Sequence, residues 1–259
     1  MHRIFVDGIE DGRIAADDPG LLLGMTIFET MRTYDGAPFR MDSHLRRLDH
    51  SARIMGIELN SVAGLKTSIE SVLGKCNPVD DVRIRVTITA GGSRVIDVKT
   101  LDFEKVGAFI RVGKLQWDPP NYLPGVIKHG SRASWVVASR HQGVPEVLLV
   151  DSAGCILEAS RSNVFAVMDG VIVTPKPDSR FLEGVTRGSL IEAASNAGIT
   201  VRETTLPFDS TYEEFYLSST LKQLAPVVEI AGDKAPGGGP LGASLRSAFL
   251  ELVKREHPG

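Results

Sequence analysis

The sequence contains only two cysteines, Cys76 and Cys155, among its 259 residues. Two cysteines cannot build a disulfide framework, and neither stands at a metal-ligand spacing, so we expect a reduced protein without a metal site. No hydrophobic run approaches the ~18 residues that a membrane span needs. The N-terminus also lacks the apolar region of a signal peptide. These absences indicate a soluble, cytoplasmic protein.

An excess of charge of one sign is also missing. Lys and Arg number 29 against 32 Asp and Glu, which gives a formal net charge of −3. This balance argues against a dedicated surface for nucleic acid or an acidic membrane. Hydrophobic residues make up 42% and charged residues 24%, and these ordinary values exclude wholesale disorder. A chain of this length forms one large or two modest domains.

A proline-rich segment divides the chain. Three prolines lie within the ten residues 116–125, QWDPPNYLPG. Because proline fixes φ and lacks an N–H group, this segment is neither a helix nor a central strand. We therefore expect an N-terminal α/β domain over 1–115, a linker over 116–125 and a C-terminal domain over 126–259.

Periodicity predicts elements in both halves. Residues 82–89 alternate between apolar and polar, which is typical of a half-buried strand, and the polar face carries Arg83 and Arg85. The pair Asp169-Gly170 lies between two apolar runs and suits the type I′ turn of a hairpin. Apolar residues at helical spacing predict helices over 43–57, 187–197 and 243–254. This alternation of helices and strands indicates the α/β (α+β) class.

Five short segments carry a more specific signal. In chain order they are IFETMRTYDGAPFRMDSHLRRLDHSA (27–52), VIKHGSR (126–132), VLLVDSAGCILEASRSNVFAVMDGVIVTP (147–175), FLEGVTRGSLIEAA (181–194) and EEFYLSSTLKQLAPV (213–227). Together they resemble the class IV aminotransferases, the fold-type-IV enzymes of pyridoxal 5'-phosphate (PLP), which include branched-chain and D-amino-acid aminotransferases and aminodeoxychorismate lyase. The resemblance covers nearly the whole chain. It implies a small N-terminal α/β domain and a larger C-terminal α/β pseudo-barrel domain, with PLP between them, in a homodimer.

The resemblance implies a covalent site at Lys128. The family's Schiff-base lysine stands in a Lys-x-x-Asn-Tyr-like motif, which here reads KHGSR. Such a lysine needs a pKa lowered by burial or by a nearby cation, and Arg132 is a suitable neighbour. Glu158 matches the acidic position of the family pattern E-x-x-x-x-N and would hydrogen-bond the protonated pyridine nitrogen. Taken alone, Lys128 would be interpreted as a solvated surface lysine and Glu158 as an acid at the end of a strand.

The phosphate contacts that the resemblance implies come from three segments. The guanidinium group of Arg47 suits a phosphate. Val185 and Thr186 begin a predicted helix, whose first N–H groups attract an anion. Ser219 and Thr220 match a Ser/Gly-Thr pair that supplies further donors in the family.

The residues expected on the substrate side are Phe28, Glu29, Arg85, Arg94 and Arg132. The first two match the F-E-T segment that borders the pocket in the family. D-amino-acid aminotransferases and aminodeoxychorismate lyases commonly carry an arginine just before the glycine that follows the 82–89 strand. This chain has Ala90 there, so one of the three arginines in the set would have to pair with the substrate carboxylate.

The resemblance predicts an enzyme that moves an amino group between an amino acid and a 2-keto acid through a Schiff base on Lys128. Two alternatives remain. The Lys-His-x-x-Arg spelling and the short chain are reminiscent of aminodeoxychorismate lyase, which would release pyruvate and 4-aminobenzoate. A non-catalytic relative that acts as a binding protein is the third possibility. The sequence leaves the amino donor, the acceptor and the L or D preference open.

Overall fold

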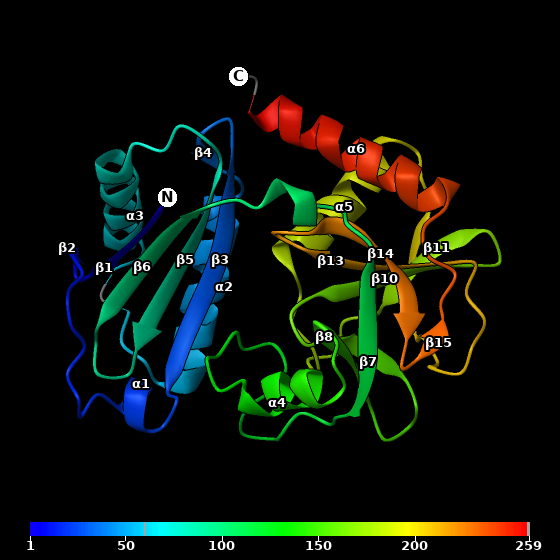
Figure 1. Cartoon of the computed structure of the whole chain (residues 1–259), viewed down its shortest axis with the longest axis horizontal. Helices are drawn as coiled ribbons and strands as arrows, with labels where there is room; N and C mark the ends of the chain where they lie inside the picture. Colours follow the sequence, from blue (N-terminus) through cyan, green and yellow to red (C-terminus); the bar gives the residue numbers. More distant parts are fainter. Residues whose placement is uncertain (60, 258–259) are drawn as a thin grey trace. The chain divides into compact units, whose positions relative to one another are not determined.

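The computed structural model describes residues 1–59 and 61–257. It contains two compact units, each built around one sheet (Figure 1). The first comprises Met1–Asp102 and Ile127–Ser131, and the second comprises Phe103–Val126 and residues 132–257. This division differs in two places from the expected ranges 1–115, 116–125 and 126–259.

Strand pairing explains both differences. Strand β7 (Ile110–Gln116) lies in the second unit because it pairs in parallel with β8 (Glu146–Val150) and with β14 (Gln223–Ile230). The segment Ile127–Ser131 joins the first unit because it runs along β3 (Thr26–Tyr34), where Ile27 and His129 form a β-bridge. Lys128 therefore belongs to the first unit, although it follows the proline-rich segment.

The first unit consists of a six-stranded sheet with helices on one face (Figure 1). The strands run in the order β2-β1-β6-β5-β3-β4, and besides β3 their bounds are β1 (His2–Val6), β2 (Ile9–Glu10), β4 (Ala37–Pro38), β5 (Val82–Thr89) and β6 (Arg94–Thr100). The helices are α1 (Pro19–Leu22), α2 (Met41–Met55) and α3 (Val62–Cys76). Helix α2 corresponds to the helix expected over 43–57, and it ends where Gly56 adopts a φ of 62°.

The alternation predicted for residues 82–89 is confirmed. Val82, Ile84, Val86 and Ile88 belong to the buried core under the helices. Because successive side chains of a strand point to opposite faces, Arg83, Arg85 and Thr87 lie on the face that the helices leave open. The first unit thus offers one polar sheet face on which a site can be built.

The second unit is built on a nine-stranded sheet with both parallel and antiparallel pairs. The order is β12-β11-β10-β13-β14-β7-β8-β9, with β15 paired to β14. The remaining bounds are β9 (Ile156–Ala159), β10 (Asn163–Met168), β11 (Val171–Pro175), β12 (Val201–Thr204), β13 (Glu214–Ser219) and β15 (Asp233–Lys234). The helices are a short 3-10 turn (Phe103–Lys105), α4 (Ala133–His141), α5 (Val185–Asn196) and α6 (Pro240–Glu256).

Two predictions for this unit are confirmed. Strands β10 and β11 form the expected hairpin, and Asp169 and Gly170 take the positive φ values of 53° and 69° that a type I′ turn requires. Helices α5 and α6 correspond to those expected over 187–197 and 243–254, and they pack against each other (Figure 1).

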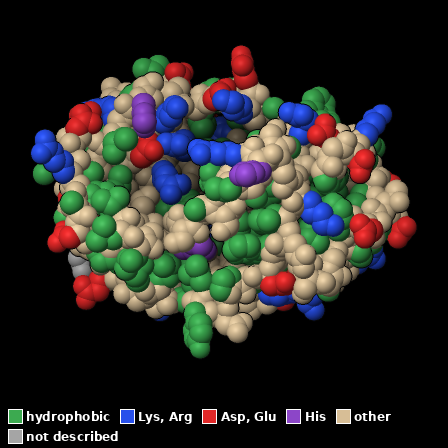
Figure 2. All heavy atoms as spheres, turned by 60° about the horizontal axis from the view of Figure 1, so that its bottom comes forward, with side chains coloured by type: hydrophobic (Ala, Val, Ile, Leu, Met, Phe, Trp, Pro, Cys, Tyr) green, Lys and Arg blue, Asp and Glu red, His purple; other side chains and the backbone are tan. Residues whose placement is uncertain are grey.

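The surface carries charges of both signs. Figure 2 shows acidic and basic side chains interspersed with hydrophobic ones on one face of the molecule. Among the described residues, none of the helices has the length and apolar character that crossing a membrane requires. Within the same residues, His, Cys, Asp and Glu side chains form no group of three or more that could hold a metal ion.

Candidate active site

The lysine segment is held against the edge of β3 by backbone hydrogen bonds. The N–H of Phe28 donates to the carbonyl of Lys128 at 3.0 Å, and the N–H of Gly130 donates to the carbonyl of Thr26 at 2.8 Å. A Cβ atom on Gly130 would lie 1.9 Å from Oγ1 of Thr26, so only glycine permits this close approach. Lys128 is thereby placed directly across from Phe28, on the same face of the sheet.

Two cations meet on the ring of Phe28. The Nζ atom of Lys128 lies 4.9 Å from the ring centroid, and the Cζ atom of Arg85 lies 3.7 Å from it. Burial, with a smaller contribution from Arg83, lowers the pKa of the Arg85 guanidinium below its usual value. The structure therefore brings three predicted residues, Phe28, Arg85 and Lys128, together on the open face of the first sheet.

Glu29 lies on the opposite face of β3 and is 0% exposed. Its Oε1 atom accepts from Nε of Arg47 at 2.7 Å, and its Oε2 atom accepts from the second guanidinium nitrogen at 2.8 Å. Nδ1 of His44 also lies 2.8 Å from Oε2, and it must carry the proton because a carboxylate only accepts. Burial opposes the charge of Glu29, but Arg47 and His44 outweigh it and hold the Glu29 pKa far below its ordinary range.

The helical repeat explains this arrangement. His44, Arg47 and Ser51 are spaced three and four residues apart on α2, so they share the face that meets β3. The structure places Glu29, expected on the substrate side, as the partner that fixes the predicted phosphate ligand Arg47. A bidentate carboxylate holds a guanidinium in one orientation, which suits a residue that must meet a phosphate at a fixed point.

Ser51 links the arginine to the lysine segment. Its hydroxyl donates to the carbonyl of Arg47 at 3.0 Å and accepts from the N–H of Lys128 at 3.2 Å. One side chain thus sets the spacing between α2 and the backbone of Lys128.

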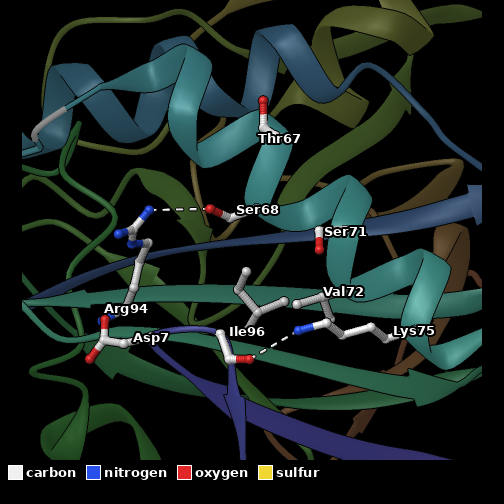
Figure 3. A pocket seen from close by; sticks show the side chains of 9 residues that line it. Asp7, Thr67, Ser68, Ser71, Val72, Lys75, Arg94 and Ile96 are labelled. Carbon is white, nitrogen blue, oxygen red and sulfur yellow. Dashed lines mark hydrogen bonds between the residues drawn. The ribbon is translucent and has the colours of Figure 1, made fainter.

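Arg94 is not placed with this group. Its guanidinium donates to the hydroxyl of Ser68 at 3.2 Å, on the side of the sheet that α3 covers. Figure 3 shows it at one end of a cavity of about 270 Å³ between α3 and β6, with the Lys75 ammonium group reaching toward the same cavity. Lys128, Phe28 and Arg85 occupy the opposite face, so Arg94 points away from the lysine.

The second unit positions Glu158 next to a heavily hydrogen-bonded turn. Glu158 is a buried residue of β9, and residues 160–162 connect this strand to β10. The Arg132 guanidinium donates to the carbonyl of Ser160 and lies 4.6 Å from the Trp135 ring. Arg132 therefore contacts the turn that follows Glu158.

The N-terminus of α5 lacks a side-chain cap. Its N-cap is Gly184, which provides no side-chain cap hydrogen bond. A Cβ atom at Gly184 would lie 2.1 Å from Oδ1 of Asn163, whose Nδ2 donates to the Leu182 carbonyl at 2.7 Å. Val185 and Thr186, which the sequence predicts as phosphate donors, lie in the first turn of this helix, where backbone N–H groups have no acceptor inside the helix and suit an anion.

A buried hydroxyl without a partner lies close to that helix start. Ser218 is 1% exposed, and its Oγ atom has no hydrogen-bond partner among the described residues. It lies across from Asn163 in the β10–β13 ladder, so both side chains share the face where residues 182–184 turn. Ser219 and Thr220 follow at the end of β13. An orphaned hydroxyl and an uncapped helix fit a phosphate group, which accepts several hydrogen bonds at once.

Comparison with known proteins agrees with this geometry. The family model described as "Amino-transferase class IV" matches residues 26–230. The chain is 30% identical to the branched-chain-amino-acid aminotransferase of Escherichia coli (strain K12) over 281 residues, which cover 95% of this chain and 90% of the relative. The chain belongs to the class IV aminotransferases. It is therefore an enzyme, a PLP-dependent aminotransferase.

Solved structures of aminotransferases show the same fold. The crystal structure of the E. coli branched-chain enzyme has a TM-score of 0.86 and 28% identity, and the match covers 96% of this chain and 94% of that one. An aminotransferase from Brucella abortus, bound to the cofactor PLP, has a TM-score of 0.85 at 23% identity, with 97% and 98% covered. The expected fold-type-IV α/β architecture is confirmed.

Several residues of the site were not found from the sequence. His44 and Ser51 lie on the same helix face as Arg47. Their spacing of three and four residues from Arg47 within the predicted helix 43–57 could have indicated this. Ser218 directly precedes the Ser219-Thr220 pair. It lies in a segment whose pattern predicts a buried strand, so nothing in the sequence was a reason to select its hydroxyl. Glu146 and Lys222, described below, lie far apart in the sequence, and only the folded sheet brings them together.

Proposed function

We propose that Lys128 is the residue that carries PLP covalently in this aminotransferase. The observation that supports it is the position of the ammonium group, 4.9 Å from the Phe28 ring and next to the Arg85 cation. An amine attacks a carbonyl in its neutral form, and the Phe28 ring and the Arg85 guanidinium are the groups beside the Lys128 amine.

The proposed ligands of the cofactor are the residues that the family resemblance implies. Arg47 binds the phosphate, with Val185, Thr186, Ser219 and Thr220 adding backbone and hydroxyl donors. The buried carboxylate of Glu158 would accept a hydrogen bond from the protonated pyridine nitrogen. The Glu29 clamp on Arg47 and the orphaned Ser218 hydroxyl support the phosphate assignment.

PLP supplies an electron sink, which lets the carbon beside a bound amine lose a proton. The chain supplies the base for that proton. The Lys128 amine would act as this base: it would accept the proton from the substrate α-carbon and then donate it again. Glu158 keeps the pyridine nitrogen protonated during this transfer, because a carboxylate stabilises the cation through a charge-assisted hydrogen bond.

We further propose amino acids with branched apolar side chains, and their 2-keto acids, as the substrate class. The relative that is 30% identical over 95% of this chain carries that activity in its name. In the first unit, Arg85 and Lys128 both contact the Phe28 ring, so we assign Arg85 to a substrate carboxylate. Arg132 would act through the turn after Glu158 rather than on the substrate, since its guanidinium contacts the Ser160 carbonyl.

The experiment is a substrate panel on the PLP-loaded enzyme. L- and D-amino acids and aminodeoxychorismate are added singly while the visible absorbance band of the bound cofactor is recorded. We expect the band to disappear with L-leucine, L-isoleucine and L-valine and to return with their keto acids. A response to aminodeoxychorismate alone, with release of pyruvate, would assign the lyase reaction instead.

We also propose a cytoplasmic homodimer. Leu21, Leu22 and Leu23 are 66%, 64% and 70% exposed, and three consecutive exposed leucines favour burial against a second copy. Size-exclusion chromatography with light scattering measures the mass. A particle of one chain at micromolar concentration would contradict the dimer.

A further inference from the structure

A second fully buried carboxylate, that of Glu146, has no part in the proposed chemistry. It is 0% exposed at the start of β8. Its Oε2 atom accepts from the Arg161 N–H at 3.1 Å, and its Oε1 atom accepts from the Ser162 hydroxyl at 3.2 Å. The Lys222 ammonium pairs with the same carboxylate and lies 3.4 Å from the Ser162 hydroxyl. One carboxylate therefore joins two turns that are 60 residues apart in the sequence.

These are the two turns that flank the proposed cofactor ligands. Residues 160–162 connect the strand of Glu158 to the strand of Asn163. Lys222 follows Thr220 by two positions, and its backbone N–H donates to the Ser219 hydroxyl at 3.3 Å. The Glu146 carboxylate thus fixes the segment beside the pyridine-nitrogen ligand relative to the segment that carries the phosphate donors.

The pair depends on both charges. Burial alone would raise the pKa of Glu146, but Lys222 and Arg161 outweigh it and hold that pKa below its ordinary range. The Lys222 side chain is itself only 21% exposed. Removing one member of such a pair leaves the other charge buried without compensation, so both turns would shift to let water in.

We propose that Glu146 and Lys222 are positioning residues for PLP: their buried ion pair holds the Glu158 turn and the Ser219-Thr220 segment at the spacing that the cofactor needs. This inference rests on the proposed ligands of PLP. It assigns a role to two residues that are not among those proposed ligands.

The test measures the PLP dissociation constant of the apoprotein by titration, together with its melting temperature. We expect Glu146→Gln and Lys222→Met each to raise the dissociation constant at least about tenfold. Lys222→Arg keeps the charge and the donors, so its dissociation constant should stay within about threefold of wild type. This rescue separates a positioning pair from side chains that merely fill space.

Glu214→Gln is the matched control. Glu214 is another buried carboxylate of the second unit, and it accepts from the N–H groups of Leu241 and Gly242 at the start of α6. It should lower the melting temperature while leaving the PLP dissociation constant within about twofold. The proposal is overturned if Lys222→Met stays folded and binds PLP like wild type, or if Glu214→Gln weakens binding equally. A wild-type protein that forms no visible band with PLP would instead contradict the proposed function.

Discussion

Each unit contains one fully buried glutamate that holds a cation, and the two pairs differ in how they hold it. Glu29 of the first unit grips Arg47 through two parallel hydrogen bonds and has His44 as a third partner. Glu146 of the second unit meets Lys222 through a single ammonium group. A guanidinium fork has one orientation, whereas an ammonium group on a flexible stem has many. The first pair therefore suits the orientation of one ligand, and the second suits the spacing of two segments.

The largest expected effect comes from removing the first carboxylate. Glu29→Ala leaves the Arg47 guanidinium without its bidentate partner beside a buried histidine. We expect the free energy of unfolding, measured by urea denaturation, to fall by about 3–5 kcal/mol. Asp42→Ala is the control, since its ion pair with Lys66 is exposed and is worth about 0–1 kcal/mol. Equal losses in the two variants would remove the distinction between buried and surface pairs.

Substitutions of Arg47 test the role of its bidentate guanidinium group. Arg47→Ala should raise the PLP dissociation constant by about tenfold or more, because a charge-assisted phosphate bond contributes ~1.5–3 kcal/mol. Arg47→Lys keeps the charge but loses the fork, so we expect severalfold weaker binding here, unlike the tolerated Lys222→Arg. Substrate preference should not change. An unchanged PLP dissociation constant in Arg47→Ala would exclude Arg47 from the phosphate site.

Glu158 lies beside the turn that the second pair holds. Glu158→Gln should still retain PLP, but kcat should fall about tenfold to a hundredfold, or ~1.4–2.7 kcal/mol in the barrier, because an amide cannot stabilise a protonated pyridine nitrogen as a carboxylate does. Steady-state assays at saturating PLP measure this. A rate within about twofold of wild type would rule out the pyridine-nitrogen role.

The smallest expected effect is on the pH dependence of stability, because the first pair includes a histidine, His44, as a third partner. Burial lowers the pKa of His44, with Glu29 opposing, so the folded state takes up its proton at lower pH than the unfolded chain. Stability should therefore fall as the pH drops below about 6.5, by at most ~1.4 kcal/mol per pH unit for this one proton. The lowered pKa values of Glu29 and Glu146 add a further loss below about pH 4.3.

His44→Gln isolates that proton. The amide can still donate to Glu29 but does not titrate, so the slope of melting temperature against pH between about 5 and 6.5 should flatten. Identical slopes in wild type and His44→Gln would show that His44 does not set this dependence.

The sequence predicted most of the regular elements. Alternation over 82–89 identified the open face of Arg85, and the Asp169-Gly170 pair identified the hairpin, because local periodicity and turn chemistry determine both. The domain boundary was harder to predict. Residues 127–131 leave their sequence neighbours to pair with β3, a long-range contact that no local pattern records.

The hydrogen-bond partners of the charged residues also could not be predicted from the sequence. Glu29 and Arg94 were expected near the substrate, yet Glu29 is inside the helix–sheet interface and Arg94 contacts Ser68 on α3. A residue of the first sheet can lie on the same face as Lys128 or on the opposite one. Which of the two holds depends on how the segment of Lys128 packs against β3. That docking is decided by Gly130 fitting against Thr26, a contact between residues more than a hundred positions apart.

Borohydride reduction tests most directly whether Lys128 is the amine that binds PLP. Reduction of the PLP-loaded enzyme, followed by proteolysis and mass spectrometry of the peptides, locates the amine to which the cofactor is attached. The account predicts a single pyridoxyl label on Lys128 and none in Lys128→Ala, whose turnover should fall by a factor of about a thousand or more. A label on any other lysine, or turnover that persists in Lys128→Ala, would contradict it.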